Sequence, residues 1–135
     1  MPSRPPQDLL DAATAALKHA YCPYSQFPVA AAIRSSNQNI YTGCNIENAA
    51  YSLCCCAETN TIGSMINSGD TTISQILVLI PGPKPASPCG GCRQQLSEFS
   101  TKATKIYLCC TQGQHEHYSF FDLLPHSFNA QLLEK

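Results

Sequence analysis

The sequence predicts an α/β fold, a three-layer α/β/α sandwich around a mixed sheet of roughly five strands. Segments with helical periodicity alternate along the chain with short apolar segments. One segment, residues 73–80, is apolar almost throughout, as in a central strand that is buried on both faces. The order helix, hairpin, helix, strand, helix, strand, strand then requires helices that cover one sheet.

The first predicted elements are a helix and a hairpin. Residues 7–20 carry apolar side chains at intervals of three and four, which gives a helix one apolar face. Residues 27–35 and 40–45 are predicted to pair as antiparallel strands across the turn residues 37–39. The centre of the first strand is small and apolar, so we expect other backbone to pack close to it.

A loop over residues 47–55 is expected to lead into a second helix over residues 56–67. Gly69 follows the last turn, and glycine readily takes the left-handed conformation that ends helices. The inward-facing side chains of this helix are predicted to be Ile62, Met65 and Ile66.

After the central strand, the prolines and glycine of residues 81–85 exclude regular structure. A third helix is expected over residues 89–99, followed by strands over residues 105–110 and 116–121. A short helical piece is predicted to start at Asp122. These elements complete the sheet and the helical layers that the fold class requires.

The composition is that of a single domain, predicted over residues 1–135. Hydrophobic residues make up 44% of the chain, which is ample for a packed core. Charged residues make up only 13%, which suggests that some surface is buried against other subunits. The net charge is -1 and the basic residues are scattered, so a nucleic acid polymer is not an expected partner.

The nine cysteines bear on the compartment. In a short secreted chain this density would indicate disulfides. Residues 1–8, however, are polar and rich in proline and lack the apolar stretch of a secretory signal. No window approaches the length of a membrane span. We therefore expect a cytoplasmic protein without membrane contact, whose thiols are reduced and either bound to metal or buried.

Two short segments are interpreted as one zinc site. They read Cys-Ala-Glu, ending at Glu58, and Pro-Cys-Gly-Gly-Cys, ending at Cys92. Cys56, Cys89 and Cys92 supply three thiolates and leave one tetrahedral position open, as in catalytic rather than structural zinc sites. A single zinc ion would acidify water bound there. Glu58 is predicted to move protons beside the metal rather than to bind it.

The cysteines also allow other interpretations. Taken alone, the Cys-x-x-Cys spacing fits a redox pair as well as a metal site, and the Cys-Ala-Glu segment favours zinc. Cys54 and Cys55 adjoin Cys56, and the spacing to Glu58 selects Cys56 as the ligand. Cys54 and Cys55 are expected to be small packing residues, with a reactive thiol at one of them as the alternative. Four further cysteines are expected to be buried: Cys22, Cys44, Cys109 and Cys110.

With these segments in place, the sequence resembles the cytidine deaminases of the small, homotetrameric, three-cysteine zinc type. The likeness covers nearly the whole chain. The matching runs are YCPYSQFPV at 21–29, GCNIENA at 43–49, CAE at 56–58, SPCGGCRQ at 87–94 and LLPHSF at 123–128. The resemblance implies hydrolytic deamination of cytidine and deoxycytidine to uridine and deoxyuridine plus ammonia, a reaction of pyrimidine salvage.

The resemblance also implies roles for individual residues. Glu58 would deprotonate the attacking water, protonate the ring nitrogen and later protonate the leaving amine. Phe27 would stack on the pyrimidine, while Asn45 and Glu47 would hydrogen-bond sugar hydroxyls. Further contacts are implied for the backbone N–H of Ala57, the carbonyl of Ser87, and Phe128, which would reach into a neighbouring subunit's site.

One departure from the family pattern bears on activity. Thr59 follows Glu58 where the family has arginine, so a cation that offsets the charge of three thiolates is replaced by a neutral residue. Arg93 is a partial substitute. The alternatives are therefore a weakly active or non-catalytic zinc-binding paralogue, and a deaminase of blasticidin S-type nucleoside antibiotics, against which Glu47 argues. A deaminase that edits polynucleotides is least favoured, because the basic residues are scattered.

Overall fold

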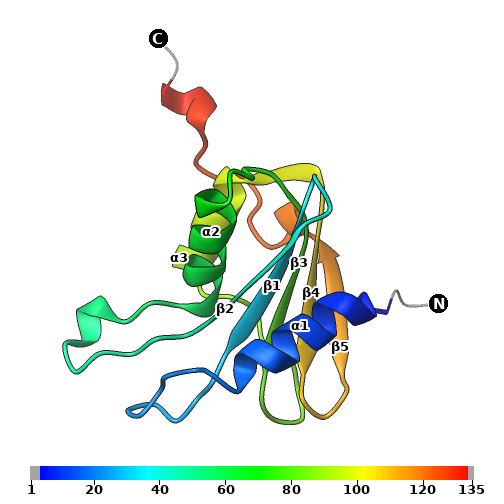
Figure 1. The fold of residues 1–135 in the computed structure, drawn as a ribbon. Coiled ribbons are helices and arrows are strands. Elements are labelled where there is room, and N and C mark those ends of the chain that lie inside the picture. The colour runs from blue at the N-terminus through cyan, green and yellow to red at the C-terminus, as the bar shows by residue number, and fades with distance from the viewer. Residues whose placement is uncertain (1–3, 134–135) are drawn as a thin grey trace.

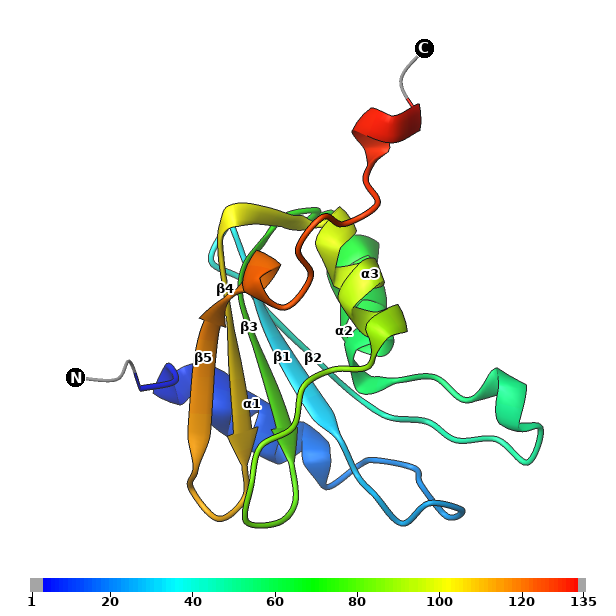
Figure 2. The same ribbon diagram turned by 180° about the vertical axis from the view of Figure 1, so that it is seen from behind.

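The sheet is mixed and has five strands in the order β2-β1-β3-β4-β5. The computed structural model describes residues 4–133 (Figures 1 and 2). The strands are β1 (Ala30–Ser35), β2 (Ile40–Cys44), β3 (Ile73–Ile80), β4 (Ser100–Cys110) and β5 (His115–Ser119). β3 and β4 run parallel, and the other neighbouring strands run antiparallel.

Helices cover both faces of this sheet. α1 (Gln7–Leu17) packs against β1, β2 and β3 on one face. α2 (Ala57–Asn67) and α3 (Gly90–Glu98) lie together on the opposite face (Figures 1 and 2). The predicted three-layer α/β/α arrangement is therefore confirmed. No helix among residues 4–133 is long and apolar enough to cross a membrane.

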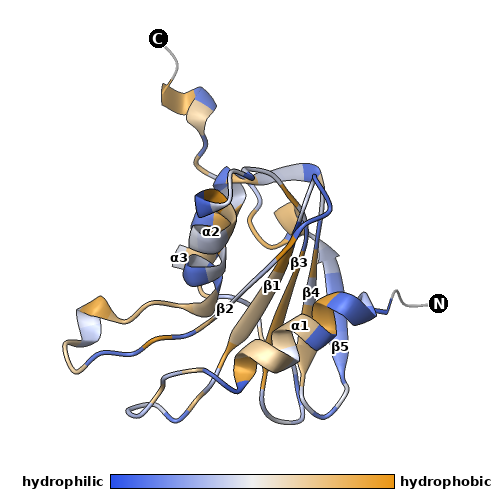
Figure 3. Cartoon of the chain, viewed as in Figure 1, coloured by the Kyte–Doolittle hydropathy of each residue, from blue (hydrophilic) through white to orange (hydrophobic). Residues whose placement is uncertain are grey.

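β3 forms the centre of the core and is hydrophobic along much of its length (Figure 3). Its buried side chains belong alternately to two clusters, one under each helical layer. Ile76 and Val78 belong to the buried cluster that includes the α2 residue Met65. Leu77 and its neighbours on the same side belong to the second cluster, beneath α1. A strand buried on both faces is apolar at successive positions, which is why the run at 73–80 was identifiable from sequence.

α2 lies unusually close to the sheet where β2 passes beneath it. A Cβ atom added at Gly43 would be 2.7 Å from the backbone nitrogen of Thr61 and 3.1 Å from the carbonyl oxygen of Ala57. Only glycine permits this approach without a shift of the helix. The contact fixes the height of the α2 N-terminus above the sheet, and this end of the helix carries Cys56 and Glu58.

Some element ends differ from the prediction. β1 begins at Ala30 rather than at residue 27, because the Val29 N–H and the Phe27 carbonyl bond to the side chain of Asn45 instead of to strand backbone. β4 begins at Ser100, five residues before the predicted residue 105, because Ser100 already pairs with Ile73 across an irregular register.

Helix ends and facings show similar differences. α1 ends at Leu17 rather than at residue 20. Ile66 of α2 is 40% exposed, so its predicted inward facing is wrong: the core-facing stripe of this helix passes through Met65 and not its neighbour. The helical piece predicted from Asp122 is a 3-10 turn, η2 (Phe120–Asp122), and β5 ends at Ser119. Gly69 has a φ of 97° beyond the end of α2, as predicted.

Two long loops, residues 18–29 and 45–56, extend side by side beyond the sheet (Figures 1 and 2). An isolated bridge from Tyr21 to Ile46 connects the two loops, and a second bridge, from Ile46 to Cys55, pairs the two ends of the 45–56 loop. Their exposed apolar side chains are Tyr21, Tyr24, Phe27, Ile46, Tyr51 and Leu53.

The cysteines outside the two zinc segments differ in burial. Cys54 and Cys55 are exposed, which corrects the prediction that they are packing residues: they lie in a loop that contributes nothing to either core cluster. Cys109 and Cys110 are buried in β4 as predicted, whereas Cys22 and Cys44 are only half-buried.

Candidate active site

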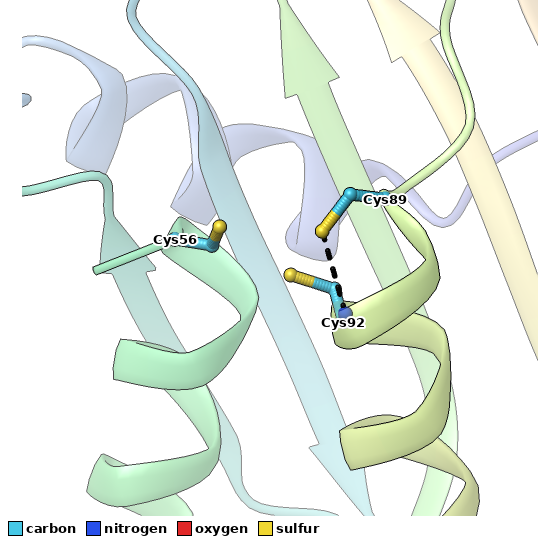
Figure 4. Close-up of side chains that lie close together, drawn as sticks. All are labelled: Cys56, Cys89 and Cys92. Atoms are coloured by element: carbon cyan, nitrogen blue, oxygen red, sulfur yellow. Dashed lines mark hydrogen bonds between the residues drawn. The ribbon is translucent and has the colours of Figure 1, made fainter. Parts of the chain in front are cut away.

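Three cysteines converge between α2 and α3. Cys56 is the N-cap residue of α2, Cys89 is the N-cap residue of α3, and Cys92 lies in the first turn of α3. Their Sγ atoms all lie within 4.8 Å of one another (Figure 4). The backbone N–H of Cys92 donates a hydrogen bond to the sulfur of Cys89, at 3.4 Å. Segments more than thirty residues apart therefore meet at one point.

This donor set fits a zinc ion. Zinc binds thiolate sulfur at about 2.3 Å, so sulfurs around one tetrahedral ion stand roughly 3.8 Å apart. Small side-chain movements bring the three sulfurs from their present separations to that spacing. Three protein ligands leave a fourth position for water or substrate, as in catalytic zinc sites.

The thiols differ in acidity. Burial raises the pKa of the Cys56 and Cys92 thiols, while the backbone N–H of Cys92 lowers the pKa of the Cys89 thiol. The N-terminal ends of α2 and α3 favour negative charge at their caps. Even so, three thiolates in one place repel one another. A coordinated metal cation is what holds such a set fully deprotonated.

Glu58 lies in the first turn of α2, two residues after Cys56, and its side chain is buried, with 4% exposure. Burial disfavours the ionised carboxylate and raises the pKa of Glu58. A raised pKa lies closer to neutral pH, and a carboxyl group with such a pKa can both take up and release a proton there. The geometry that groups the three cysteines does not include Glu58 among the metal donors.

A cavity of about 180 Å³ opens beside the cysteines. It is lined by Phe27, Val29, Asn45, Cys56, Ala57, Glu58, Val78, Ile80, Ala86, Ser87, Pro88, Cys89 and Cys92. Four of the residues predicted to contact substrate are in this wall: Phe27, Asn45, Ala57 and Ser87. The apolar wall residues Val78 and Ile80 were not predicted, because a buried strand end carries no sequence signal that it borders a cavity.

Two residues predicted to contact substrate lie outside this wall. Glu47 accepts hydrogen bonds from the backbone N–H groups of Tyr24 and Ser25 and from the Ser25 hydroxyl. Phe128 is 56% exposed and lines a different cavity, of about 520 Å³, between the C-terminal segment and the end of α3. Within its own chain Phe128 is therefore not part of the cysteine pocket.

The amide of Asn45 connects the pocket to the loop that carries Phe27. Its oxygen accepts a hydrogen bond from the Val29 N–H at 3.0 Å, and its nitrogen donates to the Phe27 carbonyl at 2.9 Å. An amide has two acceptor positions and two N–H groups. Within the part of the chain that the structure describes, one of each is used, so one of each remains for a ligand.

The two residues considered for charge balance have other partners. The Thr59 hydroxyl donates to the side-chain oxygen of Gln95 on α3. Arg93 donates to the carbonyl of Pro88 at 3.0 Å and to the carbonyl of Leu123 at 2.9 Å. Within residues 4–133, neither side chain hydrogen-bonds to a sulfur of the site. The guanidinium of Arg93 instead ties the Cys89 segment to the C-terminal segment.

A buried carboxylate beside a three-thiol metal site is the arrangement of a zinc hydrolase that activates water. Residues 3–109 match the sequence profile of the family described as the cytidine and deoxycytidylate deaminase zinc-binding region. The chain belongs to this family.

Similar proteins agree with this assignment. A cytidine deaminase of Sporosarcina psychrophila is 39% identical over 116 residues, which are 86% of this chain and 85% of that protein. One of Halalkalibacterium halodurans is 37% identical over 125 residues, 93% of this chain and 95% of that protein. The crystal structure of cytidine deaminase from Burkholderia pseudomallei superposes with a TM-score of 0.87 at 37% identity, covering 93% of this chain and all of that one.

Proposed function

We propose that this protein is a zinc-dependent deaminase that hydrolyses cytidine and deoxycytidine to uridine and deoxyuridine, with release of ammonia. The observation that carries the proposal is the buried Glu58 carboxyl in the same cavity as three converging cysteines and the exposed ring of Phe27. The relatives that span most of the chain are named cytidine deaminase, which supports cytidine-type substrates rather than a nucleoside antibiotic.

Cys56, Cys89 and Cys92 are proposed to hold one zinc ion per chain. When bound, zinc supplies a Lewis acid that lowers the pKa of a coordinated water molecule. The protein's own contribution is to present the three sulfurs from two helix N-termini, on a scaffold set by the close packing of α2 on Gly43.

Glu58 is proposed as the proton carrier. As a carboxylate it accepts the proton of the attacking water, and as the acid it donates to the ring nitrogen next to the attacked carbon. The same carboxylate then takes the proton of the hydroxyl newly formed on that carbon and donates it to the amine, so that ammonia leaves as the bond between carbon and nitrogen breaks and a carbonyl forms. Its raised pKa suits both directions of transfer, because the two protonation states lie closer in free energy near neutral pH.

The remaining wall of the cavity is proposed to recognise the base and sugar. The Phe27 ring, 46% exposed, offers a face for stacking on a pyrimidine. Ala57 and Ser87 offer a backbone N–H and a backbone carbonyl to the polar edge of the base. The free acceptor and donor of Asn45 suit a sugar hydroxyl, which needs a partner when it leaves water.

Assembly into a homotetramer with shared sites is part of the proposal. Exposed apolar side chains occur on the two projecting loops and on the C-terminal segment, where Phe128, Leu132 and Leu133 are exposed. Burying such surface between subunits is favourable. Phe128 would then complete the site of a neighbouring chain. We further propose a cytoplasmic role in pyrimidine salvage, since free thiols at the zinc site require a reducing compartment.

A spectrophotometric assay with cytidine, deoxycytidine and blasticidin S tests the proposed reaction. We expect turnover of the first two nucleosides and about one zinc per chain by elemental analysis. Cys56→Ser should lose both the metal and the activity. The matched control is Cys55→Ser, which changes the adjacent exposed thiol and should keep both. Turnover of blasticidin S alone, or equal zinc loss in the two variants, would contradict the assignment.

A further inference from the structure

The Glu47 carboxylate lies in the segment after β2 and holds the loop that carries Phe27. Its Oε1 atom accepts hydrogen bonds from the backbone N–H groups of Tyr24 and Ser25, each at 3.0 Å. Its Oε2 atom accepts a third hydrogen bond, from the Ser25 hydroxyl. These three donors thus come from two consecutive residues, Tyr24 and Ser25, of the neighbouring loop.

The direction of the Ser25 hydroxyl is fixed by a second contact. The backbone N–H of Phe27 donates to Ser25 Oγ at 3.1 Å, so the hydroxyl oxygen is an acceptor on that side. A serine hydroxyl has one hydrogen, and here it points to Glu47. Gln26, which lies between Ser25 and Phe27, has a φ of 55°. This left-handed conformation is uncommon for residues other than glycine and is held in place by the surrounding contacts.

These hydrogen bonds leave part of the acceptor capacity of the Glu47 carboxylate unused. A carboxylate has about four acceptor positions, two on each oxygen. Both positions on Oε1 are taken by backbone N–H groups, and one on Oε2 is taken by Ser25. Among the donors of residues 4–133, no other bonds to this carboxylate, so one acceptor position remains, on Oε2. The hydroxyl of Ser25 holds the pKa of Glu47 below its usual range, so this position belongs to an ionised group at neutral pH.

We propose that Ser25 is a positioning residue for sugar recognition, which holds the Glu47 carboxylate so that its single free acceptor position receives one ring hydroxyl of the substrate. This proposal rests on the proposed nucleoside deaminase function and on the sugar contact that the family resemblance implies for Glu47. One acceptor position binds one hydroxyl, so a sugar that keeps one ring hydroxyl satisfies it. A sugar that lacks both the 2′ and the 3′ hydroxyl leaves the carboxylate without that donor.

The mechanism of the effect is orientation. Without the Ser25 hydroxyl, Oε2 loses the hydrogen bond that fixes the orientation of the carboxylate plane. Oε1 keeps its two backbone donors. The free acceptor position then points in no fixed direction, and part of the sugar's binding free energy is spent on orienting it. The proton-carrying Glu58 is on a different element and is untouched by this change.

The test compares Ser25→Ala with Ser25→Thr, and with Ser36→Ala as a control at an exposed serine on the β1–β2 turn. Steady-state kinetics are measured with cytidine and deoxycytidine, and 2′,3′-dideoxycytidine is measured as substrate or competitive inhibitor. For Ser25→Ala we expect KM for the first two to rise roughly tenfold, with kcat changed less than about twofold. Binding of dideoxycytidine should change less than about twofold, and Ser25→Thr should restore KM because it keeps the hydroxyl.

Three results would overturn the proposal. The first is an unchanged KM in Ser25→Ala. The second is an equal loss for all three nucleosides, which would show that the residue only stabilises the loop. The third is a matching fall in kcat and in thermal stability. A wild-type protein that deaminates none of the nucleosides would overturn both this proposal and the proposed function, whereas an active wild type with any of the three results overturns this proposal alone.

Discussion

Replacement of Gly43 by alanine tests whether the contact between β2 and α2 sets the geometry of the metal site. The φ of Gly43 is not in the left-handed region, so an alanine backbone is allowed there and the effect is one of space alone. The added Cβ would lie 2.6 Å from Thr61 Oγ1, 2.7 Å from Thr61 N and 3.1 Å from Ala57 O, whereas ordinary contact begins at 3.4 Å.

The magnitude follows from what has to move. Two of the three atoms are helix backbone, which cannot rotate away as a side chain can. α2 must therefore rise from the sheet by roughly 0.7 Å at its first turns, and overpacking of this kind costs about 1–3 kcal/mol. For a domain of this size that corresponds to a fall in Tm of roughly 3–10 °C. The shift also displaces Cys56 relative to Cys89 and Cys92, so zinc affinity should fall.

Gly63→Ala is the matched control. Gly63 lies within α2, and a Cβ there would meet no atom within 4 Å. Alanine favours the helix over glycine by about 0.5–1 kcal/mol, so this variant should be at least as stable as the wild type. Thermal unfolding and competition with a zinc-binding dye measure both properties. A Gly43→Ala protein that melts and binds zinc like the wild type would refute the close-contact argument.

Three further predictions concern single side chains. Glu58→Gln should keep zinc but lose at least about 10²-fold in kcat, the usual scale of general acid–base catalysis, and near-normal turnover would assign proton transfer elsewhere. Hydrogen bonds from Tyr41 and three neighbouring side chains hold the pKa of Asp70 well below its usual range. Asp70→Asn should therefore lower Tm at pH 7, and the difference should shrink as the pH falls below about 4, because Asp70 then protonates in the unfolded chain while the folded protein still holds it ionised; a gap independent of pH would contradict this. Phe128→Ala should raise KM while light scattering still reports four chains, and a fully active monomer would refute shared sites.

Local patterns in the sequence were enough to predict several features. The run at 73–80 is apolar because both faces of β3 are covered, and this shows in the composition of the segment itself. The zinc segments are equally local, since Cys56 and Glu58 are two positions apart and Cys89 and Cys92 three. Spacing of that kind decides which side chains share one end of a helix, whatever the rest of the chain does.

Contacts between distant segments were decided only by the tertiary structure. Helical periodicity could not tell that Ile66 lies at the exposed edge of α2, because the width of the covered stripe depends on the sheet beneath it. The hydrogen-bond partners of Arg93 were likewise not predictable. Its side chain bonds to the carbonyls of Pro88 and Leu123, and folding is what brings these two carbonyls together around it.

The sequence by itself determined the α/β/α class and the chemistry of the metal ligands, because both depend on periodicity and spacing within short segments. The structure decided how Asn45 and Glu47 are used. Each side chain uses part of its hydrogen-bonding capacity to hold the loop around Phe27, and the rest is unused within residues 4–133. That division depends on which backbone groups from a loop some twenty residues away meet each side chain, and neither residue type nor spacing encodes such a meeting.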